Sequence, residues 1–104
     1  MYQKLVRDKI PEIILNNGEK PITRILSDDE YKQELERKLS EEYNEVLNAT
    51  GENRIEELAD MLEVMIALAK LENKNLEDII ETANNKKAKR GGFEQRIYLE
   101  EVRK

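Results

Sequence analysis

The chain has 104 residues, of which 39% are charged, and its formal net charge at pH 7 is −5. This acidic balance argues against a nucleic-acid polymer as partner, because phosphate backbones attract basic surfaces. The sequence contains no Cys and no His, which excludes disulfides, thiol nucleophiles, Ser-His triads and Cys/His zinc sites.

The N-terminal stretch is expected to be neither a secretory signal nor a membrane anchor. Its sequence, MYQKLVRDKIPEII, places charges inside a short apolar run, unlike a signal peptide. No apolar segment in the chain reaches the length that crosses a bilayer. We therefore expect a single domain, residues 1–104, in the cytoplasm and without a membrane partner.

The first elements in chain order are short. Residues 2–7 are expected to be extended. A short helix follows, with Asp8 as its cap and Pro11 in its first turn. Gly18, after Asn17, marks its end. The alternating and β-branched residues 20–26 (KPITRIL) predict a short strand.

Two long helices are expected in the middle of the chain. The first begins at Ser27 or Asp28 and runs to about Ala49, where Gly51 stops it. The second covers roughly residues 54–72 (RIEELADMLEVMIALAKLE).

The last helix is predicted to begin at Asn75, with Asp78 in its first turn, and to end at Gly91-Gly92. Residues 93–102 alternate weakly and are expected to pair with residues 20–26 as a small ribbon. The predicted fold class is therefore all-α, a helical bundle with a minor two-stranded β element.

The helix over residues 54–72 carries carboxylates where its apolar surface continues. At 100° per residue, Glu57 lies about 20° from both Val64 and Leu68. Asp60, three residues later, points the same way. The charged residues that instead form a narrow solvent-facing stripe are Glu56, Glu63 and Lys70.

The preceding helix repeats this pattern. Glu42 follows Leu35 by seven residues and lies near the centre of the apolar face. Glu45 is one turn further, at the margin of that face, and Glu41 lies further off. Each of the two helices thus presents an acidic pair at positions i and i+3.

Two interpretations of these pairs compete. With 23 acidic residues in the chain, pairs three apart arise often by chance, and a charged run is usually a solvated face. Acidic pairs that converge near an apolar interior are costly, because desolvation and mutual repulsion both oppose ionisation. A divalent cation removes that cost, and all-oxygen ligands suit Mg²⁺ or Mn²⁺. Such a cage in a helical bundle indicates phosphate-ester or pyrophosphate chemistry.

The same residues resemble a known signature. EEYNE (residues 41–45) followed by EELAD (residues 56–60) is similar to the EExxE…ExxD pattern of the all-α nucleoside triphosphate pyrophosphohydrolases, which include the MazG-like, dimeric dUTPase-like and phosphoribosyl-ATP pyrophosphohydrolase-like proteins. KLVRDKIPEII near the start and KKAKRGGF near the end resemble the phosphoribosyl-ATP pyrophosphohydrolase-like branch. The resemblance spans nearly the whole chain.

The resemblance implies a Mg²⁺-dependent enzyme that cleaves between the α and β phosphates of a nucleoside triphosphate, giving a nucleoside monophosphate and pyrophosphate. By position, it makes Glu42, Glu45, Glu57 and Asp60 the metal ligands. It leaves Glu41 as an outer-shell partner or base.

Basic and amide side chains are the candidates for binding the substrate. The basic residues near the end of the last predicted helix would steady the leaving pyrophosphate, although they also suit the helix dipole. A solvated N-terminal segment explains Arg7 equally well, and Asn84 suits a base edge. The candidate substrate-binding residues are Lys86, Lys87, Lys89, Arg90, Asn84 and Arg7.

The helix over residues 54–72 is apolar over roughly three quarters of its circumference, more than its neighbours can cover. We therefore expect a homodimer or homotetramer. Two alternatives remain open: phosphoribosyl-ATP as the substrate, or a non-enzymatic helical interaction module. The module leaves the acids on apolar faces unexplained.

Overall fold

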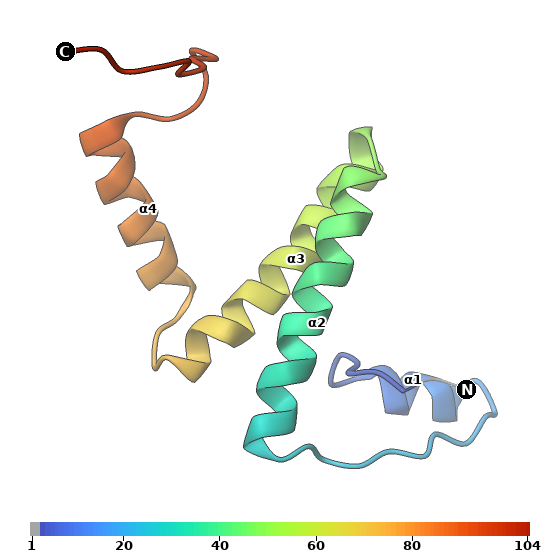
Figure 1. Ribbon diagram of the computed structural model, residues 1–104. Helices are drawn as coiled ribbons and strands as arrows, with labels where there is room; N and C mark the ends of the chain where they lie inside the picture. The colour runs from blue at the N-terminus through green and yellow to red at the C-terminus, as the bar shows by residue number, and fades with distance from the viewer. Residues whose placement is uncertain (1–2) are drawn as a thin grey trace.

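The structure, a computed structural model that describes residues 3–104, is built from four helices and has no strand in that range. The helices are α1 (Ile10–Asn16), α2 (Asp28–Leu47), α3 (Gly51–Leu71) and α4 (Leu76–Arg90), as Figure 1 shows. The predicted all-α class is thereby confirmed. None of these helices combines the length and apolar character needed to span a bilayer within the described residues.

The predicted starts of α2 and α4 are confirmed as capping boxes. Ser27 Oγ accepts a hydrogen bond from the Glu30 backbone N–H, while the Glu30 carboxylate accepts one from the Ser27 N–H. Asn75 and Asp78 make the same reciprocal pair at α4. Hydrogen bonds from Arg24 and from Ser27 lower the pKa of Glu30 to about 2.

Two predicted helix ends are wrong. Lys9, not Asp8, is the N-cap residue of α1, and it makes no side-chain capping bond, although Pro11 does lie in the first turn. Gly51 does not stop α2 but opens α3, with a φ of 59° that favours glycine. The chain turns in the three residues between Leu47 and Gly51, so α3 starts three residues earlier than predicted.

The predicted ribbon is also wrong. Residues 20–26 and 93–102 are both non-helical, but neither is a strand. Figure 1 shows the first segment beneath α2 and the second beyond the far end of α4. Because α4 diverges from the other helices, it carries the C-terminal segment away from its expected partner.

The main packing contact in the described chain is an antiparallel hairpin of α2 and α3, which α4 touches only near the end of α3. Leu35 on α2 and Val64 on α3 are the buried apolar residues, at 3% and 8% exposure. The radius of gyration is 18.3 Å, compared with about 13 Å for a compact domain of this length. The single chain is therefore extended and leaves much apolar surface open.

Candidate metal centre

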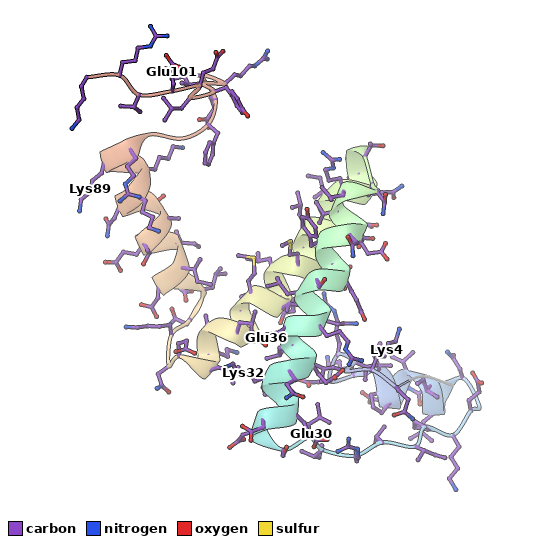
Figure 2. The ribbon with its side chains drawn as sticks, in the orientation of Figure 1. Lys4, Glu30, Lys32, Glu36, Lys89 and Glu101 are labelled. Atoms are coloured by element: carbon purple, nitrogen blue, oxygen red, sulfur yellow. The ribbon has the colours of Figure 1, made fainter. Side chains whose placement is uncertain are left out.

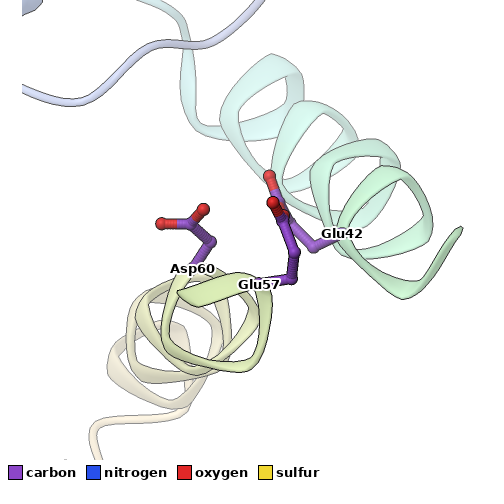
Figure 3. A group of neighbouring side chains, drawn as sticks. All are labelled: Glu42, Glu57 and Asp60. Atoms are coloured by element: carbon purple, nitrogen blue, oxygen red, sulfur yellow. The ribbon is translucent and has the colours of Figure 1, made fainter. Parts of the chain in front are cut away.

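Three carboxylates converge on one side of the α2–α3 hairpin. Glu42 comes from α2, and Glu57 and Asp60 come from α3; one oxygen of each lies within 4.8 Å of the other two. Figure 3 shows the two glutamate side chains lying together, with Asp60 beside them. All three residues are half-buried.

The helix period explains why these residues meet. Glu42 follows the buried Leu35 by seven residues, and Glu57 precedes the buried Val64 by seven. Seven residues are close to two helical turns, so each glutamate shares a face with the buried residue of its helix. Since the helices are antiparallel (Figure 1), both steps lead toward the α2–α3 connection, and the two carboxylates lie close together there.

The electrostatics of the cluster oppose full ionisation. Partial burial raises the pKa of Glu42, and the charges of Asp60, Glu57 and Glu45 raise it further, while Lys38 lowers it. Partial burial also raises the pKa of Glu57, with added repulsion from Glu45, Asp60 and Glu56. Without a metal ion, the cluster therefore contains unfavourable interactions between like charges.

Glu45 and Glu41, the other acidic residues of the signature, lie outside the triplet. Glu45 is near enough to raise the pKa of both Glu42 and Glu57. The Glu41 side chain is 48% exposed, and its Oε2 lies 3.8 Å from Lys38 Nζ. The structure thus brings three of the four predicted ligands together and places Glu45 next to them.

One basic candidate from the sequence reaches the cluster. Arg7 Nη2 donates a hydrogen bond of 2.7 Å to Asp60 Oδ1, across 53 residues of sequence. Both side chains are partly exposed, Arg7 at 57% and Asp60 at 44%. From the sequence, a solvated role explained Arg7 equally well, because contacts so distant along the chain leave no periodic signal.

Lys38 is a second cation at the cluster and is not among the residues predicted from the sequence. It lies one helical turn before Glu42 and lowers the pKa of that residue. Lys38 precedes Glu41 by three residues and Glu42 by four. On a helix these spacings place Lys38 beside both carboxylates, and they were the signal in the sequence that could have identified it.

The candidates on α4 lie elsewhere in this chain. Figure 1 shows α4 diverging from the hairpin, so its basic end is not brought to the acidic cluster of the same chain. Lys86 borders an open groove of about 660 Å³ between the end of α3 and α4. The α4 residues whose roles as substrate contacts stay predictions are Asn84, Lys86, Lys87, Lys89 and Arg90.

The donor set fits a hard divalent cation. All three groups offer carboxylate oxygens, which Mg²⁺ and Mn²⁺ prefer over the softer ligands that this chain lacks. One oxygen of each carboxylate lies within 4.8 Å of the other two, so one cation could be shared by all three residues.

Comparison with known proteins gives little further information. No family model and no solved structure matches the chain. An uncharacterized protein of Mycolicibacterium smegmatis (strain ATCC 700084 / mc(2)155) is 54% identical over 43 residues, which make up 41% of this chain and 44% of that protein. The chain therefore matches less than half the length of this curated relative, whose description states no activity.

Proposed function

We propose that this chain is a Mg²⁺-dependent nucleoside triphosphate pyrophosphohydrolase of the all-α, MazG-like superfamily, in its phosphoribosyl-ATP pyrophosphohydrolase-like branch. It would cleave the bond between the α and β phosphates, releasing a nucleoside monophosphate and pyrophosphate. The observation that carries the proposal is the meeting of Glu42, Glu57 and Asp60 from two helices at half-buried positions.

These three residues would hold the ion, with Glu45 as the fourth candidate ligand beside them. Bound there, Mg²⁺ or Mn²⁺ would offset the charge of the triphosphate and polarise its phosphoryl oxygens. The helix hairpin holds these ligands rigidly, because Glu42 and Glu57 each lie about two turns from a buried apolar residue of their own helix.

Glu41 is the candidate general base. Its carboxylate is exposed, lies outside the triplet and precedes a proposed ligand by one residue. From there it would accept a proton from the attacking water while the bond to the leaving pyrophosphate breaks.

Arg7 and the basic end of α4 are the proposed phosphate contacts. The end of α4 would reach the phosphates across an intersubunit interface. Asn84 is proposed to contact the base.

A nucleotide panel with Mg²⁺, assayed for pyrophosphate release, tests this function. We expect turnover of at least one ordinary, deoxy or modified triphosphate, and none after chelation with EDTA. The panel also includes phosphoribosyl-ATP, which would identify the substrate of the alternative enzyme. Absence of pyrophosphate from every member would contradict the proposal.

Ligand variants give the matched controls. Glu57→Gln and Asp60→Asn should each abolish turnover, whereas Glu63→Gln, on the exposed side of the same helix, should leave turnover near wild type. Circular dichroism would show that all three variants keep their helices. Near-normal turnover in both ligand variants would refute the assigned metal role.

A non-enzymatic interaction module is the second candidate, and one observation favours it. Large apolar side chains are exposed over α3 and the C-terminal segment, including Leu58, Leu62, Phe93 and Tyr98. Such a surface would suit binding to another protein, but this function does not explain why the acidic residues of the cluster lie together. Failure of the nucleotide panel would favour this alternative.

A further inference from the structure

The Arg7–Asp60 ion pair joins the N-terminal segment to the acidic cluster. The guanidinium lies 2.7 Å from an oxygen of a proposed metal ligand. Residues 3–9, which carry it, are non-helical, so no helix has to unwind for Arg7 to move. A cation supplied by the chain itself thus occupies one carboxylate of the cluster.

Relative strengths indicate which cation holds Asp60 when a metal is present. An ion pair as exposed as this one contributes little to stability, because solvent screens it and both side chains lose freedom. A divalent ion carries twice the charge and would bind three carboxylates together, whereas Arg7 donates its hydrogen bond to Asp60. The exchange therefore favours the metal.

We propose that Arg7 is an internal counter-ion which occupies Asp60 in the metal-free protein, yields that carboxylate to the divalent cation, and then binds phosphate oxygens of the substrate. This inference rests on the proposed function and adds to it a defined role for the N-terminal segment. Arg7 becomes a substrate-binding residue whose availability depends on the metal.

Charge balance supports the exchange. Of the three negative charges that the ionised carboxylates carry, Arg7 offsets one, while a divalent ion would offset two. The metal-loaded site is therefore a better match for a polyanion, and the released guanidinium adds a further positive charge. Its planar donors suit the paired oxygens of a phosphate group, and its 57% exposure leaves it open to such a ligand.

Two titrations on the full chain test this role without any turnover. The first follows Mn²⁺ binding by electron paramagnetic resonance in the absence of nucleotide. In Arg7→Gln we expect Mn²⁺ to bind about two- to five-fold more tightly than in the wild type, because an exposed competing ion pair is lost.

The second titration adds preformed magnesium tripolyphosphate to Mg²⁺-saturated protein in a calorimeter, so that neither base nor sugar contributes. Here Arg7→Gln should weaken binding by about ten-fold, through loss of charged hydrogen bonds to phosphate. Arg7→Lys, which keeps the charge but not the fork of donors, should fall between wild type and Arg7→Gln in this titration.

Arg24→Gln is the matched control. Arg24 makes an exposed ion pair of 2.8 Å with Glu30, twelve residues before Glu42 and roughly 18 Å along the helix from it. This variant should leave both titrations at wild-type values. Circular dichroism would confirm that each variant is folded.

The outcomes separate this inference from the proposed function. Weaker or unchanged Mn²⁺ binding in Arg7→Gln would overturn the counter-ion role. Tighter Mn²⁺ binding with unchanged tripolyphosphate binding would overturn the transfer to phosphate. If the wild type binds no Mn²⁺, the proposed metal centre is wrong and the inference fails with it. If the wild type binds Mn²⁺ and Asp60→Asn does not, the proposed metal centre stands.

Discussion

Glu57 shows how one residue ties the fold to the candidate site. It lies seven residues before the buried Val64, so it is held against α2, and the charges of Glu45 and Asp60 repel it. Its raised pKa means that the folded state favours the protonated carboxyl relative to the unfolded chain. Glu57 therefore contributes to the stability of the folded state at pH values below its pKa in the unfolded chain. This contribution is lost as the pH rises through its higher pKa in the folded state.

Glu57→Gln should therefore raise the metal-free thermal midpoint at pH 7, by roughly 2–4 °C, the scale of a surface substitution in a small domain. Thermal melts in EDTA between pH 7 and pH 4 would measure the effect, and the gain should shrink toward pH 4 as the carboxyl protonates. Glu63→Gln on the solvent stripe should show no such gain. A clear drop in the midpoint of Glu57→Gln would instead indicate a structural network.

The sequence carried enough information to predict the acidic residues of the site, but not the ion pair that Arg7 makes with one of them. Glu42, Glu57 and Asp60 were predictable because their angular positions on two helices conflict with the surrounding apolar surface. Arg7 contacts Asp60 across 53 residues. No local period reports such a contact, since it depends on how the N-terminal segment passes the hairpin.

At the scale of the element, the start of α2 depends on its capping box. Ser27→Ala removes the hydroxyl that accepts the Glu30 N–H bond, so it should lower the free energy of unfolding by about 1 kcal/mol. Urea unfolding followed by circular dichroism measures this loss.

Thr50→Ala is the control for that prediction. Thr50 is the N-cap residue of α3, but its side chain makes no capping hydrogen bond. We expect a much smaller loss for Thr50→Ala than for Ser27→Ala. Equal losses in the two variants would show that the capping box does not account for the stability of α2.

Some element boundaries were predictable and others were not, for a physical reason. Capping boxes are local, so Ser27 and Asn75 could be identified from neighbouring residues. Gly51 has a positive φ, which suits either the end of one helix or the start of the next. It starts α3 because the connection from α2 takes only the three residues before it. The prediction of a ribbon between residues 20–26 and 93–102 was wrong because the ribbon's formation depends on the direction of α4, which no local sequence pattern specifies.

At the scale of the whole molecule, the described chain leaves many large apolar side chains exposed. Figure 2 shows side chains projecting into solvent along α4 and around the C-terminal segment. Exposed apolar residues also continue along α3, where Ile55, Leu58 and Leu62 are 62%, 44% and 38% exposed. So much exposed apolar surface on a chain of this size is typical of proteins that pack against a partner.

We propose that a second copy covers this surface, in a homodimer or homotetramer. Light scattering at micromolar concentration should then give a mass that is a multiple of the 12.2 kDa chain. A monomeric mass under these conditions would count against assembly.

Leu62→Glu places a charge on the exposed face of α3 and should shift the assembly toward smaller species, because burying an unpaired charge at an interface is costly. Light scattering on this variant, compared with the charge-altering Glu63→Lys beside it, measures the shift. Unchanged mass for Leu62→Glu would place the interface elsewhere on the chain.

Glu42, Glu57 and Asp60 are together proposed to bind a divalent cation. A crystal structure of the protein soaked with Mn²⁺, with anomalous diffraction data, tests it most directly. We predict an anomalous peak between the three carboxylates, at about 2.1 Å from their ligating oxygens. Well-ordered carboxylates with no peak between them at saturating Mn²⁺ would contradict the account.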